Sequence, residues 1–413
     1  MAFRHLEMSD IMPRPRILLI GEAVTLAHVA RPLSLAQDLD PDRYEIELAF
    51  APRYHHLLPD LAFPVHDLDS IPGERFLAAL ASGRPLYDLE TLEHYVEDDL
   101  ALLSERRPDV VIGDFRLSLA VSAPLLRIPY LAISNAYWSP FARQHFPVPE
   151  LPLVKALGVG IAQPLFDLAR PLAFACHALP MHRLRRRYGL PSLGLDLRRV
   201  YTHADHTLYA DLADWVQMQT LPDNHHFLGP LHWSPAVALP SWWDDLPADR
   251  PLVYVNLGSS GCAELLPALC DALHPLGLDI LAATAGRSPQ LPTDSSRIHL
   301  ADYLPGEVAA ARAQLVICNG GSLAVYQALA AGVPVLGLPS NLDQFLNMAS
   351  VVRHGVGLCL RASRADAGTV RQAVHRLLES PVYRENARHF QSRISESSGS
   401  TVLDRLLSAI TRT

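Results

Sequence analysis

The sequence predicts an α/β fold built from two parallel-sheet domains. Its 413 residues exceed the usual size of a single hydrophobic core. Strand-like apolar runs alternate with helix-like runs through both halves of the chain. The alternation lapses once, in a segment rich in proline and tryptophan at residues 229–251. Continuous apolar strands are typical of parallel sheets that helices cover on both faces. We therefore expect one domain over residues 1–235 and a second over residues 236–385.

The first half of the chain contains the elements of one such domain. Strand-like segments occupy residues 16–23, 44–51, 108–115 and 129–134, and helix-like segments occupy residues 28–39 and 117–126. The carboxyl ends of parallel strands share one edge of a sheet, and folds of this class bind their ligands there. Functional side chains are therefore expected just after these strands.

The second half repeats the pattern. Strand-like segments occupy residues 252–260, 279–286, 297–304 and 313–321, and a helix-like segment occupies residues 262–276. Near the end, apolar residues recur at helical spacing, at Val402, Leu403, Leu406, Leu407 and Ile410. We expect the tail, residues 386–413, to form a helical segment that packs back on the N-terminal domain.

Charge and lysine content exclude several classes of function. Basic residues number 35 and acidic residues 43, and the resulting net charge of −8 offers no field that would attract a nucleic acid. Lys155 is the only lysine. The chain therefore has no Gly-Lys-Ser/Thr phosphate loop, and Schiff-base chemistry is disfavoured.

Cysteine usage and hydropathy indicate a soluble protein. No run reaches the ~18 uninterrupted apolar residues of a spanning helix, and the nearest candidate, residues 151–179, is broken by charged residues and proline. We expect a cytoplasmic protein, with loose membrane association left open as an alternative. The cysteines are odd in number and widely spaced, and are expected to be reduced, buried thiols: Cys176, Cys262, Cys270, Cys318 and Cys359.

The segment ICNGGSLAVYQALAAGVPVLGLPSNLDQFLN, residues 317–347, carries the strongest motif. Gly320, Gly321 and Ser322 stand where a strand turns into a helix. A helix N-terminus favours phosphate, and glycines let the backbone approach a diphosphate closely. Alone, the glycine pair would indicate an ordinary turn. The motif gains weight from Asp343-Gln344, which follows the next strand.

With these motifs the chain resembles the UDP-glycosyltransferase family, including bacterial macrolide and natural-product glycosyltransferases. Those proteins have the GT-B fold, in which two Rossmann-like domains face a cleft. Tyr303-Leu304-Pro305 matches the segment whose aromatic residue packs on the nucleotide base, and Asp343-Gln344 matches the pair that binds sugar hydroxyls. Residues 253–259 resemble the first strand and loop of the donor domain. The resemblance implies these donor-binding residues: Gly258, Ser259, Ser260, Tyr303, Asn319, Gly320, Gly321, Ser322, Gln327, Asp343 and Gln344.

Four donor-site residues depart from the family pattern. Asn319 replaces a histidine that touches the donor phosphates, Leu323-Ala324 replaces a common Gly-Thr, and Gln327 replaces a glutamate that binds ribose hydroxyls. Glutamine offers one carbonyl acceptor where a carboxylate accepts from both hydroxyls. We expect weakened UDP binding, with a dTDP-sugar as a serious competitor.

The resemblance assigns catalysis to His28 and Asp114. A lone histidine near a helix start is usually structural, and an aspartate at a strand end could cap the next helix. In the resembled family, a histidine at this place with a proline shortly after it is the general base that deprotonates the acceptor. The aspartate orients the imidazole and stabilises its protonated form. Both residues follow parallel strands, so both can face one cleft.

The acceptor site is less marked in the sequence. The aromatic cluster Tyr137, Trp138, Phe141 and Phe146 follows a strand end and is expected to line the acceptor pocket, with a place in the core as the alternative. The apolar residues 151–179 suggest a hydrophobic small molecule or lipid. The arginine run at residues 183–187 is read as a solvated helix face, and contact with a lipid headgroup is the weaker alternative.

These observations predict an inverting glycosyltransferase that needs no metal or cofactor and uses a UDP- or dTDP-sugar. Histidines outside this site lack zinc-site spacing and are expected on the surface or in loops: His55, His56, His203, His206, His225 and His226. A catalytically silent homologue with a binding or activating role is one rival. A nucleotide-sugar 2-epimerase is the other, and the absence of an acid from NGGSLAVYQ disfavours it.

Overall fold

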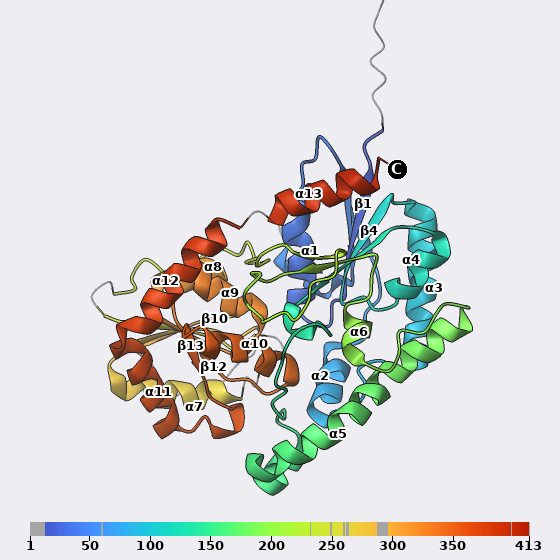
Figure 1. Cartoon of the computed structure of the whole chain (residues 1–413). Coiled ribbons are helices and arrows are strands. Elements are labelled where there is room, and N and C mark those ends of the chain that lie inside the picture. Colours follow the sequence, from blue (N-terminus) through green and yellow to red (C-terminus); the bar gives the residue numbers. More distant parts are fainter. Residues whose placement is uncertain are drawn as a thin grey trace, which may run out of the picture.

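The computed structural model describes residues 13–58, 61–231, 233–247, 250–258, 261, 264–286, 296–397 and 399–412. They form two α/β halves, each with one sheet between helices (Figure 1). The segment between β7 and β8, which includes the proline- and tryptophan-rich stretch, carries no strand or α-helix in its described residues.

The N-terminal sheet has seven strands in the order β3-β2-β1-β4-β5-β6-β7, and its recorded pairings are all parallel. The strands are β1 (Arg16–Gly21), β2 (Glu45–Phe50), β3 (Val65–Asp67), β4 (Val110–Asp114), β5 (Tyr130–Ser134), β6 (His206–Tyr209) and β7 (His225–Phe227). The helical segments are α1 (Ala27–Asp38), η1 (Pro52–Leu57), α2 (Gly73–Ser82), α3 (Leu89–Arg106), α4 (Leu119–Leu126), η2 (Ala136–Trp138), α5 (Pro152–Arg187) and α6 (Leu197–Tyr201).

The C-terminal sheet has six strands in the order β10-β9-β8-β11-β12-β13, again parallel. The strands are β8 (Leu252–Asn256), β9 (Asp279–Ala283), β10 (Ile298–Ala301), β11 (Leu315–Cys318), β12 (Val335–Gly337) and β13 (Gly357–Cys359). The helical segments are α7 (Leu265–Leu273), η3 (His274–Leu276), α8 (Gly306–Arg312), α9 (Ser322–Ala330), α10 (Leu342–Arg353), η4 (Ala362–Arg364), α11 (Ala367–Glu379), α12 (Pro381–Ser395) and α13 (Gly399–Ile410).

Local sequence explains where several of these elements begin. β1 and β4 are apolar runs buried along nearly their whole length, as expected for strands covered on both faces. The Asp88 side chain accepts from the Thr91 backbone N–H and caps α3. Asn341 and Gln344 form a capping box at α10, with each side chain satisfying a backbone N–H of the first turn.

The two halves share a core. One cluster of buried side chains contains Tyr137 and Trp215 from the first half and Tyr326 and Leu346 from the second. Trp215 Nε1 donates to Asn347 Oδ1 across the junction at 3.0 Å. The junction is therefore apolar with a few directed hydrogen bonds.

The last helix, α13, lies against the N-terminal sheet rather than the sheet it follows (Figure 1). Leu403 and Leu407 are fully buried in a cluster with strand residues of β1 and β2. Tyr44 donates from its hydroxyl to Asp404 at 2.9 Å. The end of the chain thus ties the first half to the second.

Three expectations for single residues need correction. Cys176 and Cys359 are exposed, and Cys262 lies outside the described residues. His225 is not a surface histidine, because it lies in β7 with its Nδ1 2.6 Å from the Tyr209 hydroxyl. Burial lowers the pKa of His225 to about 4.

None of the helices in the described residues is both long enough and apolar enough to cross a bilayer.

Candidate active site

A cleft of about 870 Å³ lies between the two sheets. Its walls include residues that follow β1, β4 and β5 on one side and β8, β10 and β11 on the other. Both sheets therefore present their carboxyl ends to the cleft, where such folds bind ligands. His28, Trp138, Gly258 and Tyr303 are among the lining residues.

His28 and Asp114 are hydrogen-bonded across the sheet edge. His28 lies in the first turn of α1, and Asp114 is the last residue of β4. His28 Nδ1 lies 2.8 Å from Asp114 Oδ1. A carboxylate only accepts, so the Nδ1 position carries the proton and Nε2 of the neutral ring is left as an acceptor. The Asp114 side chain is fully buried, whereas that of His28 is 19% exposed at the cleft.

Arg31 contacts both members of this pair, and it was not predicted from the sequence. Its Nε donates to Asp114 Oδ2 and its Nη2 to Asp114 Oδ1, both at 2.7 Å, and Nη1 donates to Asn135 Oδ1 at 2.7 Å. Burial alone would lower the pKa of Arg31, but the Asp114 carboxylate holds it above its usual value. The guanidinium therefore fixes the carboxylate with two bonds while His28 uses one of the same oxygens. Its position in the sequence could have indicated this role, because residues three apart in a helix, such as 28 and 31, share one helix face.

Phe115 is a second residue that the sequence reading missed. Its ring is stacked on the His28 imidazole, with centroids 4.7 Å apart and planes 10° apart. The Phe115 backbone has φ of 59°, in the left-handed region that a bulky residue rarely adopts. This turn places the ring flat against the imidazole and limits the ring planes that His28 can take.

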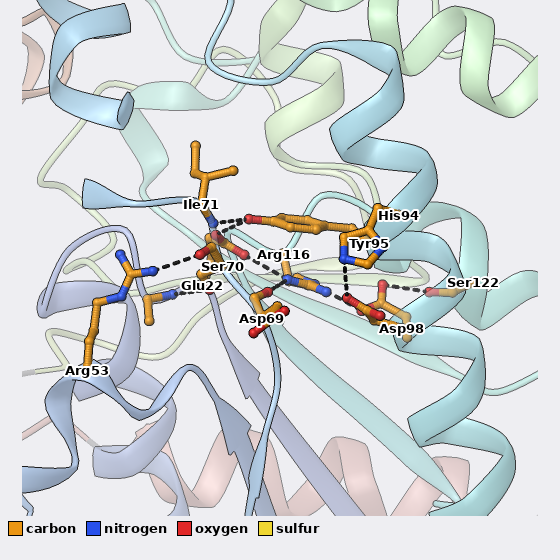
Figure 2. A network of polar contacts seen from close by, with 12 residues as sticks. Glu22, Arg53, Asp69, Ser70, Ile71, His94, Tyr95, Asp98, Arg116 and Ser122 are labelled. Atoms are coloured by element: carbon orange, nitrogen blue, oxygen red, sulfur yellow. Dashed lines mark hydrogen bonds and ion pairs between the residues drawn. The ribbon is translucent and has the colours of Figure 1, made fainter. Parts of the chain in front are cut away.

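A buried polar network joins the segments that follow β1 and β4 (Figure 2). Arg116, two residues after Asp114, donates from Nε to Asp99 at 2.9 Å and from Nη1 to Glu22, just after β1, at 3.2 Å. Tyr95 donates to the other Glu22 oxygen at 2.9 Å. Burial raises the pKa of both Glu22 and Asp99, with Arg116 opposing the effect. The network ties the end of β1 to the end of β4, next to the His28–Asp114 pair.

The side of the cleft that is predicted to bind the donor includes glycine turns and the neutral side chain of Asn319. Gly320 has φ of 84°, and a Cβ there would lie 2.6 Å from Met348 Cγ, so only glycine fits. Asn319 Oδ1 accepts from the Gly321 N–H at 2.9 Å, and the Asn319 amide packs against Gly258. Ser259 and Ser260 lie outside the described residues. Gly321 and Ser322 line the cleft at the start of α9.

Gln327 lines the cleft, but its amide nitrogen is bonded to the segment that connects the two sheets. Its Nε2 donates to the Trp233 carbonyl at 2.6 Å, on the segment that connects the two sheets. A glutamate at this position would place a carboxylate against that carbonyl. The departure at residue 327 is thus explained locally by a hydrogen bond to the connecting segment.

Asp343 and Gln344 have different surroundings. Asp343 accepts from Trp138 Nε1 at 2.7 Å, which joins the predicted sugar contact to the predicted acceptor wall. Gln344 Oε1 accepts from the Asn341 N–H at 3.3 Å, which is its part of the α10 capping box, and from the Ser340 N–H at 2.9 Å. Gln344 therefore has a structural role whether or not it also meets a sugar.

Of the four predicted acceptor residues, Trp138 alone lines the cleft. Tyr137 is fully buried in the shared core, Phe146 packs edge-on against Phe174, and Phe141 packs edge-on against His225. Tyr137 and Phe146 lie in the buried core, whereas Phe141 is half-buried and does not line the cleft. The aromatic and apolar walls come instead from α2, the turn after β4, α5 and α6: Phe76, Leu80, Phe115, Phe166, Phe174 and Tyr201.

A chain of polar contacts runs from the His28–Asp114 pair, through Arg31, to α9. Asn135, which accepts from Arg31, donates to both oxygens of Asp211 at 3.2 Å. Tyr326 of α9 donates to the same carboxylate at 2.9 Å. Burial raises the pKa of Asp211 to about 6. The two halves of the cleft are therefore joined by hydrogen bonds as well as by packing.

Known proteins match this chain over most of its length. Residues 268–408 match the model of the family described as "Erythromycin biosynthesis protein CIII-like, C-terminal domain". The "PGL/p-HBAD biosynthesis glycosyltransferase" of Mycobacterium tuberculosis (strain ATCC 25177 / H37Ra) is 50% identical over 386 residues, 94% of this chain and 89% of that one. The chain belongs to this family of glycosyltransferases.

Two further relatives of this glycosyltransferase come from Mycobacterium bovis (strain BCG / Pasteur 1173P2). The "PGL/p-HBAD biosynthesis rhamnosyltransferase" is 51% identical over 374 residues, 91% of this chain and 83% of that one. The "Inactive PGL/p-HBAD biosynthesis glycosyltransferase" is 52% identical over 292 residues, 71% of this chain and 79% of that one.

Solved structures confirm the predicted GT-B fold. "Spinosyn Forosaminyltransferase SpnP" superposes with a TM-score of 0.69 at 18% identity, covering 97% of this chain and all of that one. "Spinosyn Rhamnosyltransferase SpnG complexed with thymidine diphosphate" gives a TM-score of 0.66 at 18% identity over 95% of this chain and all of that one. The resemblance read from the motifs is thus correct at the level of fold and of enzyme class.

Proposed function

We propose that this glycosyltransferase moves a sugar from a thymidine or uridine diphosphate sugar to a hydroxyl of a lipid-like acceptor, with inversion at the anomeric carbon. The observation that carries the proposal is the 2.8 Å contact between His28 Nδ1 and Asp114 at the cleft that Gly321 and Ser322 also line. A base and a phosphate-binding turn face one space. This is the arrangement that displacement of a diphosphate by a hydroxyl requires.

In the proposed reaction, His28 Nε2 takes the proton of the acceptor hydroxyl as its oxygen attacks the anomeric carbon. The bond between that carbon and the diphosphate oxygen breaks, and its electron pair leaves with the nucleoside diphosphate. Asp114 stabilises the imidazolium that forms, and Arg31 holds the carboxylate in place. Backbone N–H groups of the turn at Gly321 and Ser322, at the N-terminus of α9, meet the developing negative charge. Because these N–H groups offset the negative charge of the leaving diphosphate, the reaction needs no metal ion for this purpose. We therefore expect activity to persist in the presence of a chelator.

Thymidine diphosphate sugars are the favoured donors in this proposal. Gln327 presents a neutral amide whose nitrogen already donates to Trp233, so a 2′-hydroxyl would find one carbonyl oxygen at most. A donor that lacks the 2′-hydroxyl loses nothing there. The solved structure of SpnG with thymidine diphosphate shows that one protein of this fold accepts such a nucleotide.

A lipid-like acceptor fits the apolar wall of the cleft. Phe76 and Leu80 from α2 face the same space as Phe166, Leu168 and Phe174 from α5. The curated relatives are named for PGL/p-HBAD biosynthesis, which supports the same class of acceptor. A silent homologue is the alternative, because one relative is named inactive. The intact His28–Asp114 pair supports the active enzyme.

The test is acceptor-dependent release of nucleoside diphosphate. Purified protein is incubated with thymidine and uridine diphosphate sugars, with and without a phenolic or long-chain hydroxyl acceptor, in buffer containing a chelator. We expect release that depends on acceptor and is faster with the thymidine donors. Nucleotide binding without release under any combination would support the silent homologue, and interconversion of the nucleotide sugars would support the epimerase.

A further inference from the structure

Helix α5 carries an exposed apolar stripe. Six large apolar side chains of this helix are exposed to solvent. The helix has a kink at Gly158, where φ is 70°, and Leu153 and Leu157 precede it. Beyond the kink the other four recur every three or four residues, so they lie along one side. Leu168 is 82% exposed and Leu172 71%. Soluble proteins rarely expose so many apolar residues together unless the surface binds something. The stripe consists of Leu153, Leu157, Ile161, Leu165, Leu168 and Leu172.

Few charged residues lie beside the stripe, but the C-terminal end of α5 is cationic. Two exposed charged residues, Lys155 and Asp167, lie between the first and last residues of the stripe. Continued at the same spacing, the line passes Cys176 and reaches Arg183 and Arg186, both exposed. The neighbouring Arg187 is paired with Glu93, whereas no ion pair is recorded for the other two among the described residues. This local positive end stands out in a chain of net charge −8.

The stripe is continuous with the active-site cleft. Leu153, Leu165 and Leu168 line the cleft and are also exposed to solvent. In Figure 1, α5 forms the lower edge of the molecule and extends beyond the body of the N-terminal half. An apolar molecule could therefore move along the helix from the outer surface into the cleft without crossing a polar barrier.

We propose that α5 docks the enzyme on the surface of an anionic lipid bilayer. The part of the stripe beyond the kink, from Ile161 to Leu172, is about 17 Å long at 1.5 Å per residue. It enters the boundary between headgroups and acyl chains, and Arg183 and Arg186 contact anionic headgroups. Amphipathic helices with apolar residues on one side and basic residues nearby bind membranes in this way. The cleft then opens at the bilayer surface, where a lipid-like acceptor would be found.

A second copy of the chain fits the stripe less well. Two α5 helices packed antiparallel about a twofold axis would set the arginines of one against the leading leucines of the other. Packed parallel, arginine would face arginine. A planar anionic surface satisfies the apolar and the cationic parts together, and it needs no complementary partner.

Vesicle flotation tests the proposal with the full chain. The vesicles are phosphatidylcholine alone or phosphatidylcholine with phosphatidylglycerol. We expect the wild-type protein to float with the phosphatidylglycerol vesicles, and less so at high salt. The double variant Ile161→Gln/Leu172→Gln, whose residues do not line the cleft, should bind at least about tenfold more weakly. Arg183→Gln/Arg186→Gln should lose the preference for phosphatidylglycerol, with binding reduced about tenfold.

Matched controls make the outcome specific. Val352→Gln/Val382→Gln removes two exposed apolar side chains from the C-terminal half, and Arg388→Gln/Arg405→Gln removes two exposed charges. Both should float like the wild type. Absence of wild-type flotation, or equal losses in the control variants, would overturn the proposal. A stripe variant that converts a dimer to a monomer, with no vesicle binding by the wild type, would assign the stripe to a second copy. Flotation uses no donor and no acceptor, so its result is independent of the proposed transfer reaction.

Discussion

The two halves of the cleft differ in how they use charge. The N-terminal half places a carboxylate, a guanidinium and an imidazole within 3.1 Å of one another at His28, Arg31 and Asp114. The C-terminal half presents Asn319 and Gln327, and its described cleft-lining residues include no arginine, lysine or histidine. In the proposed reaction the first half supplies proton transfer, and the second half binds the nucleotide mainly through backbone N–H groups. Substitutions in the two halves should therefore affect different constants.

The largest effect is expected at the base. His28→Ala should lower turnover on the order of 10²–10⁴-fold, because general-base catalysis contributes that much. Nucleotide affinity should change less than about twofold, since the base acts on the acceptor. Steady-state kinetics with calorimetric titration of thymidine diphosphate measure both. His375→Ala, at an exposed histidine on α11, is the matched control and should leave both unchanged. Wild-type turnover in His28→Ala would assign the histidine a structural role.

Arg31 sharpens the comparison through stability. Arg31→Met leaves the buried Asp114 carboxylate with one partner fewer, and breaking such a pair typically costs about 3–5 kcal/mol of unfolding free energy. The double variant Arg31→Met/Asp114→Asn removes the stranded charge, so it should recover much of the stability but little of the activity. Urea unfolding and turnover measure the two. Arg405→Met, at an exposed position, should stay within about 0.5 kcal/mol of wild type. Additive losses in the double variant would contradict the coupling.

Asp211, which joins the halves, should make stability depend on pH. Its pKa in the folded protein, about 6, lies above its ordinary value of 3.8 because of burial. The folded state then binds the proton more tightly than the unfolded state. This contribution is complete below about pH 4 and is lost as pH rises through about 6, a span on the order of 2–3 kcal/mol. Asp211→Asn should flatten this part of the pH dependence in urea unfolding. An unchanged slope would mean that Asp211 does not titrate in this range.

The smallest effect is expected at the contact between the halves. Trp138→Phe keeps an aromatic wall but removes the N–H that donates to Asp343 at 2.7 Å. A hydrogen bond to a charged group contributes about 1.5–3 kcal/mol, and water can replace part of it. We expect the KM for the donor to rise about fivefold to tenfold with little change in kcat. A fall in kcat alone would place Trp138 at the acceptor instead.

The sequence predicted the fold because parallel strands buried on both faces leave continuous apolar runs, as in β1 and β4. His28 and Asp114 were predicted as a pair because one lies at the start of the helix after such a strand, the other lies at the end of such a strand, and each matches a family position. Arg31 was missed because an arginine inside a helix usually faces solvent, whereas this one is 4% exposed. Its burial depends on Asp114, which lies 83 residues further along the chain.

Aromatic residues were harder to place, because local sequence does not reveal side-chain direction in an irregular turn. Tyr137 and Trp138 are adjacent, but one is in the core and the other lines the cleft. Gln327 shows the reverse difficulty. It appeared to be a departure in the donor site, and its reason, a hydrogen bond to the Trp233 carbonyl, depends on a contact between distant segments. Tertiary contacts of this kind are not visible in one sequence.

The most direct test of the division between the two halves is one paired measurement on two variants. Dissociation constants for thymidine diphosphate and acceptor-dependent turnover at saturating donor are measured on the same preparations of wild type, His28→Ala and Gly320→Ala. We predict that His28→Ala keeps its nucleotide affinity and loses turnover. In Gly320→Ala a Cβ would lie 2.6 Å from Met348 Cγ in the left-handed region, so this variant should lose about tenfold or more in affinity and retain most of its turnover once saturated. If both variants lose affinity and turnover together, the two halves do not divide the work, and the account is wrong.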